Sequence, residues 1–140
     1  MAGEIVVGYD GGVGAEAALT EAIALAKDLG VPLVLGFGFF PGLPERQARD
    51  YIDAVREFGE KATSEAVERA KQAGVEAEAV LVSKQPAEGL SELADERDAR
   101  MIVVGSHGER PLAGALLGST PHKLLHITHK PVLVARVPDS

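Results

Sequence analysis

Cysteine is absent from the 140 residues. Without thiols the chain can form no disulfide, no thiolate-ligated metal site and no cysteine nucleophile. Positive charge is also scarce, because 14 lysines and arginines face 21 aspartates and glutamates, which gives a formal net charge of -7. General binding to nucleic acid needs a basic surface that neutralises phosphates, so we expect no nucleic-acid partner.

Long hydrophobic runs are missing as well. The longest apolar stretch, residues 31–40, is about half of the ~20 residues that a transmembrane helix needs. The opening residues also lack the basic and apolar regions of a secretory signal peptide. We therefore expect a cytoplasmic protein without membrane attachment. A chain of this length further predicts one domain over residues 1–140.

The pattern that is present alternates between strands and helices. Apolar, often β-branched runs predict strands at residues 4–9, 31–39, 75–82, 101–104 and 131–136. The spacing of apolar residues predicts a first helix from about Ala15 to Gly30 and a second helix that ends at Gly74. A third helix is expected to begin at Pro86 and a fourth at Ser119. Strict alternation predicts an α/β fold: an open parallel sheet with right-handed crossovers and helices on both faces.

The second predicted helix carries one apolar stripe among charged residues. We expect this stripe to face the core and the charged side to be solvated. Its members are Ala48, Tyr51, Ile52, Val55, Phe58, Ala62, Ala66 and Ala70.

A glycine-rich segment, VVGSHGERPLAGALLGSTP, spans residues 103–121 just before the last predicted helix. In an open parallel sheet, ligands bind beyond the carboxyl ends of the strands, where Asp10, Gly38 and Gly105 are expected. A helix that starts near Ser119 offers unpaired N–H groups and the positive end of its dipole. The segment therefore predicts phosphate binding, with a plain wide turn as the alternative, and it matches neither the P-loop nor G-x-G-x-x-G.

The spacing Gly105-x-x-Gly108-(nine residues)-Gly118-Ser119 resembles the ATP-binding motif of the universal stress protein family. The stretches IVVGYDG, ALAKDLG, PAEGLSELADERDARMIVVGSHG and KPVLVAR are also similar, so the resemblance covers the whole chain. It implies a Rossmann-like fold of the adenine nucleotide alpha hydrolase type, with strand order 3-2-1-4-5. It also implies a homodimer formed through the fifth strand, whose apolar sequence would leave an exposed sheet edge.

The resemblance also implies a ligand, ATP or AMP with Mg²⁺ or Mn²⁺, and a set of binding residues. Tyr9, Asp10, Gly38, Val104 and Gly105 correspond to the adenine and ribose positions, and Gly108, Gly118, Ser119 and Thr120 correspond to the phosphate positions. His107 lies between two motif glycines, where it could meet a phosphate or be a solvated surface residue.

The chain departs from the family pattern at three places. Gly12 stands where the family often has serine, Gly38 replaces a branched apolar residue, and Pro121 removes an N–H from the last helix. The first two changes remove atoms near the expected adenine.

These features favour a nucleotide-binding regulatory protein of the stress response that acts as a homodimer with an unidentified protein partner. Hydrolysis should be slow or absent, because the motif supplies no lysine and no clear base. The alternatives are an ATPase or phosphotransferase that uses Asp10 or Glu109, a dimeric interaction module that has lost nucleotide, and a flavin domain of related topology. His122, His126 and His129 share one helix face and could hold zinc, although an exposed helix face is the favoured interpretation.

We predict that Gly118→Val abolishes ATP binding, because a side chain would occupy the place where a phosphate oxygen approaches the backbone. Titration calorimetry measures the affinity, and circular dichroism with thermal melting checks that the variant folds as the native chain does. Unaltered ATP affinity in the folded variant would exclude the glycine segment as the phosphate site.

Overall fold

The computed structural model describes residues 3–38, 45–106 and 119–137. The strands within these ranges are β1 (Ile5–Gly8), β2 (Leu33–Phe37), β3 (Ala77–Leu81), β4 (Met101–Gly105) and β5 (Val132–Ala135). The helices are α1 (Val13–Leu29), α2 (Glu45–Gln72), α3 (Pro86–Glu96) and α4 (Ser119–Ile127). No helix in the described ranges has both the length and the apolar composition needed to cross a membrane.

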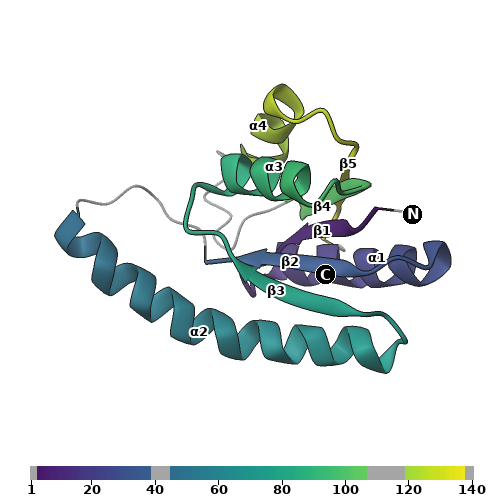
Figure 1. Ribbon diagram of the computed structural model, residues 1–140, viewed down its shortest axis with the longest axis horizontal. Helices are drawn as coiled ribbons and strands as arrows, with labels where there is room; N and C mark the ends of the chain where they lie inside the picture. Colours follow the sequence, from purple (N-terminus) through teal and green to yellow (C-terminus); the bar gives the residue numbers. More distant parts are fainter. Residues whose placement is uncertain (1–2, 39–44, 107–118, 138–140) are drawn as a thin grey trace.

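The strands form one parallel sheet in the order β3-β2-β1-β4-β5. Helices α1 and α2 cover one face of this sheet, and α3 and α4 cover the other (Figure 1). The fold class and the strand order expected from the sequence are therefore confirmed.

Side chains of the central strand alternate between two cores. Ile5 and Val7 pack with residues of α1 and α2, whereas Val6 packs with residues of α3 and α4. All three side chains are fully buried. Because both faces are covered, the strand needs apolar residues at every position, and this explains its unbroken apolar sequence.

Helix α2 is much longer than the sheet that it covers. Its 28 residues extend over about 42 Å, whereas a strand of 5 residues extends over about 17 Å. The later part of the helix packs on the sheet, with Ala66 and Ala70 buried, but Phe58 is 65% exposed. The predicted stripe is thus wrong at Phe58, because the early part of α2 extends beyond the sheet (Figure 1).

The end of β4 lies in backbone contact with the start of α1. A Cβ atom placed on Gly105 would lie 2.3 Å from the carbonyl oxygen of Gly14 and 2.6 Å from its Cα. No side chain fits in this space. Gly105 is therefore required for the packing of α1 on the sheet, whatever else it does.

We expect Gly105→Ala to destabilise the fold by about 3 kcal/mol, the upper end of the usual overpacking range, because the obstructing atoms belong to the backbone. Gly30→Ala serves as the comparison. Gly30 has a φ of 70° and nothing within 4 Å of its Cβ position, so its substitution should cost only about 1 kcal/mol of backbone strain. Urea unfolding gives both values, and equal stability of the two variants would contradict the prediction.

Candidate functional site

A cavity of about 290 Å³ opens at the carboxyl ends of β1 and β2. Its lining comes from the ends of these strands, from α2 and from the first residue of α3: Tyr9, Asp10, Phe37, Gly38, Tyr51, Phe58, Gly59, Ala62, Thr63 and Pro86. The volume is near the lower end of the range of about 300–1,000 Å³ that is typical of small-molecule pockets. Three of the residues expected from the sequence, Tyr9, Asp10 and Gly38, therefore meet in one cavity.

The turn after β1 presents the carboxylate of Asp10 to solvent. Its Oδ1 atom accepts a hydrogen bond from the Gly12 N–H at 2.8 Å, and this bond closes a tight turn with Gly11 at a φ of 82°. The Asp10 side chain is exposed. The turn therefore holds one carboxylate oxygen in place at the mouth of the cavity.

The end of β2 reaches the cavity as bare backbone. Gly38 has a φ of 76°, a conformation that a branched residue adopts only with strain. Its carbonyl accepts a hydrogen bond from the Ser83 N–H at 3.3 Å, which connects the segments that follow β2 and β3. A glycine, and not the branched residue expected from the family resemblance, is therefore the residue that suits this left-handed backbone.

Behind the cavity, one hydrogen-bonded cluster joins three elements. The buried Tyr9 donates its hydroxyl hydrogen bond to Glu16 of α1, and Arg69 of α2 donates to the other oxygen of Glu16 at 2.5 Å. Because its hydroxyl is engaged in this way, Tyr9 shapes the cavity with its ring and backbone.

This cluster shifts the pKa values of two of its members. Burial raises the pKa of the Tyr9 hydroxyl above its ordinary value, and the hydrogen bond to the Glu16 carboxylate raises it further. Partial burial opposes ionisation of Glu16, but the hydrogen bonds from Tyr9 and Arg69 hold the pKa of Glu16 below its usual value. At neutral pH the Glu16 carboxylate therefore lies between two donors, the neutral phenol of Tyr9 and the guanidinium of Arg69.

The remaining predicted residues do not line this cavity. The Val104 side chain is buried in the core beneath α3 and α4, and Gly105 contacts Gly14. Thr120 is half-buried in the first turn of α4, which begins at Ser119 as the sequence predicts. The predicted residues His107, Gly108 and Gly118 lie outside the described residues.

Sequence reasoning missed the aromatic part of the cavity wall. Phe37, Tyr51 and Phe58 line the cavity but were interpreted only as strand and core residues. The available signal was the spacing of Tyr51 and Phe58, seven residues apart, which places both on one side of a helix. That spacing alone cannot distinguish a core stripe from a cavity wall.

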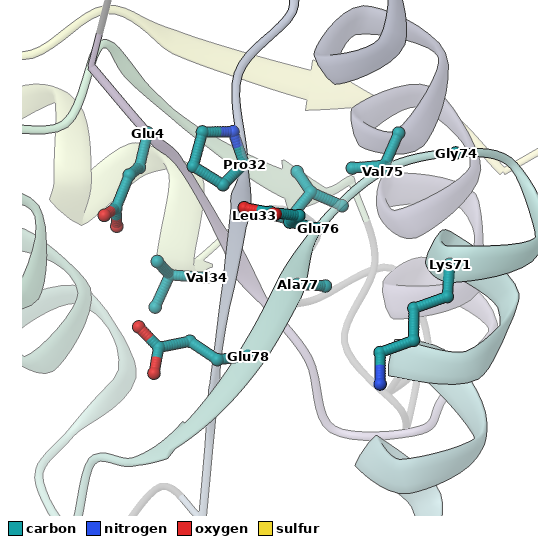
Figure 2. Close-up of a pocket in the computed structure, with 10 residues that line it drawn as sticks. All are labelled: Glu4, Pro32, Leu33, Val34, Lys71, Gly74, Val75, Glu76, Ala77 and Glu78. Atoms are coloured by element: carbon teal, nitrogen blue, oxygen red, sulfur yellow. The ribbon is translucent and has the colours of Figure 1, made fainter.

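A second hollow, of about 510 Å³, lies at the opposite edge of the sheet, near the amino ends of β2 and β3. Figure 2 shows the carboxylates of Glu4 and Glu78 near Val34, with Lys71 on the other side of β3. Both carboxylates already pair with Arg97, which lies 3.4 Å from Glu4 and also contacts Glu78. This second hollow is larger than the first cavity, but its acidic lining disfavours an anionic ligand.

Three exposed histidines, His122 and His126 of α4 and His129 after it, lie in this part of the chain. The rings of His122 and His126 meet edge to face with their centroids 4.9 Å apart, and His129 follows the end of the helix. Within the described ranges, no three histidine, aspartate or glutamate side chains are placed so that they could hold a metal ion.

Comparisons with known proteins agree on one family. The sequence model of the universal stress protein family matches residues 1–136. Universal stress protein YxiE of Bacillus subtilis is 30% identical over 148 residues, which cover 97% of this chain and 100% of the relative.

Two solved structures are similar along nearly their whole length. A universal stress protein in complex with cAMP is 30% identical with a TM-score of 0.78, over 97% of this chain and 98% of that one. The universal stress protein of Archaeoglobus fulgidus in complex with dAMP is 26% identical with a TM-score of 0.69, over 96% of this chain and 98% of that one.

The raised pKa of Tyr9 predicts that part of the stability is lost in alkaline solution. The pKa of Tyr9 is higher in the folded state than its value of about 10 in the unfolded chain. Such a group contributes fully to stability below the unfolded pKa, and the contribution falls as the pH rises above it. We expect the melting temperature of the native chain to fall more steeply above about pH 10 than that of Tyr9→Phe. Calorimetric scans of both proteins across this range test the difference, and parallel curves would contradict it.

Proposed function

Because the chain belongs to the universal stress protein family, we propose that it binds an adenine nucleotide, ATP or AMP, and acts in the cytoplasm as a regulatory homodimer of the stress response. The observation that carries the proposal is the convergence of Asp10 and Gly38, from two separate strands, on one cavity at the ligand-binding edge of the sheet. Two relatives of 26% and 30% identity bind dAMP and cAMP, which supports an adenine ligand.

The cavity suits a base and a sugar. The Asp10 carboxylate can accept hydrogen bonds from ribose hydroxyls, and its fixed turn reduces the entropy lost on binding. Gly38 leaves its backbone open to the base. We assign the predicted roles of Tyr9, Val104 and Gly105 to backbone contacts, since the Tyr9 hydroxyl and the Val104 side chain are engaged elsewhere.

The phosphates would then extend toward the start of α4. This helix has nine residues and begins at Ser119, so its first N–H groups have no partners within the helix and attract anions. Gly108, Gly118, Ser119, Thr120 and His107 are the proposed phosphate contacts. A Mg²⁺ or Mn²⁺ ion commonly binds through phosphates with one or two carboxylates, and Asp10 is the candidate on the protein.

We expect the purified protein to bind ATP and to release phosphate far more slowly than a typical enzyme turnover of ~10 per second, because the motif provides no lysine and no clear general base. Mass spectrometry of the denatured protein identifies any nucleotide that it carries, and a steady-state phosphate-release assay gives the rate.

Several turnovers per second, abolished by Asp10→Ala, would favour the ATPase interpretation instead. If the protein carries no nucleotide and has no affinity for ATP, the results would favour the interpretation of a dimeric interaction module.

The free edge of β5 supports the homodimer. The N–H of Ile102 donates to the carbonyl of Pro131 at 2.9 Å, and the N–H of Ser106 donates to that of Ala135 at 2.8 Å, so odd-numbered residues of β5 bond to β4. By alternation, the N–H and C=O of Val134 point to the open side. Val134 is 36% exposed there, and a second copy could pair with it in antiparallel fashion about a two-fold axis.

We therefore predict that Val134→Pro converts the dimer to a monomer, because proline removes an N–H that bonds to no other strand of the same chain. The matched control is Val134→Thr, which keeps this N–H and should remain dimeric. Light scattering at micromolar concentration measures the state. A monomeric native chain, or a folded Val134→Pro protein that stays fully dimeric, would rule out β5 as the interface.

A further inference from the structure

The outer wall of the cavity carries an aromatic side chain that the fold does not need for its core. Phe58 lines the cavity, yet it is 65% exposed. Water contact with a large apolar ring is unfavourable, and such a ring beside a small-molecule cavity commonly marks a binding surface. Phe58 therefore has a surface available for a ligand with an apolar face.

The position of this ring is determined by close packing of α2 on the end of β2. A Cβ atom on Gly59 would lie 2.4 Å from Cδ2 of Phe37, so the helix backbone rests directly on the Phe37 ring. One turn later, Thr63 is buried and donates a hydrogen bond to the Gly59 carbonyl at 2.6 Å. The helix segment that carries Phe58 is thus packed closely on the end of β2, with the Phe37 ring between the helix backbone and the strand.

Further along the same helix, Arg69 binds Glu16, which in turn accepts the hydrogen bond of Tyr9. These contacts join α2 to the strand that leads into Asp10. The helix that carries the aromatic wall and the segment that leads into the Asp10 turn are consequently connected by hydrogen bonds.

On the strand side, Tyr9, Asp10 and Phe37 contribute side chains to the cavity, but the residues next to them are glycines. Gly11, Gly12 and Gly38 surround the Asp10 turn and the end of β2 and contribute only backbone there. Phe58 compensates from the helix side, since its Cε1 atom lies 3.8 Å from the position that a Cβ on Gly11 would occupy. Tyr51, two turns earlier on α2, and Phe37 extend the aromatic surface around the same cavity.

From this arrangement we infer that Phe58 is a specificity-determining residue that stacks on the purine base, with Tyr51 beside it. This inference rests on the proposed nucleotide function and assigns the base to the α2 side of the cavity. Stacking on an aromatic ring recognises the face of the base and not its phosphates, so it acts on affinity for nucleotides and not for sugar phosphates.

The test compares AMP with ribose 5-phosphate, which lacks the base, by titration calorimetry on Phe58→Ala and the native chain. We expect Phe58→Ala to bind AMP about 5- to 150-fold more weakly, the range measured for loss of one base-stacking ring, and to bind ribose 5-phosphate as the native chain does. Phe58→Trp keeps an aromatic face and should restore AMP binding. Leu29→Ala, at an exposed apolar residue of α1 that does not line the cavity, is the control and should match the native chain.

Unchanged AMP affinity in Phe58→Ala would overturn the inference while leaving the proposed function in place. An equal loss for AMP and ribose 5-phosphate, or failure of Phe58→Trp to restore binding, would also overturn it, because Phe58 would then act through the shape of α2. A native chain that binds neither compound would overturn both the inference and the proposed function.

Discussion

Every strand of the sheet runs in the same direction because each is joined to the next by a helix, and this constraint determines where a ligand can bind. Parallel strands bring all their carboxyl ends to one edge, so the residues that follow β1 and β2 become neighbours although they are far apart in the chain. Covering both faces requires apolar central strands, so a polar group such as Asp10 follows the end of its strand. The parallel arrangement of the strands, with helices on both faces, thus determines both which residues are buried and where the cavity lies.

Much of this arrangement could be predicted from the sequence. Runs of apolar residues separated by amphipathic helices define an open parallel sheet. Gly38 follows β2 directly, and Asp10 is the second residue after β1. Their meeting in one cavity is a consequence of topology and needs no knowledge of side-chain packing. Strand β5 was likewise expected within a residue of its observed ends.

The cavity wall on α2 could not be predicted in the same way. Helical periodicity gives the direction of a side chain around the helix axis, but it does not say where along that axis the sheet ends. Phe58 and Ala66 share one apolar stripe, yet the first is exposed at the cavity and the second is buried on the sheet. Gly105 presents the converse difficulty: its place in a motif suggests ligand binding, while the contact with Gly14 depends on the distance between two elements, which the motif does not contain.

The overhang of α2 beyond the sheet also has an evolutionary consequence. Residues on this part of the helix face the cavity and solvent, and substitutions of exposed residues usually change stability by less than about 0.5 kcal/mol. The strand ends, in contrast, are constrained by left-handed backbone and by core packing. The part of the cavity wall that α2 supplies can therefore change at a lower cost to folding than the part that the strand ends supply.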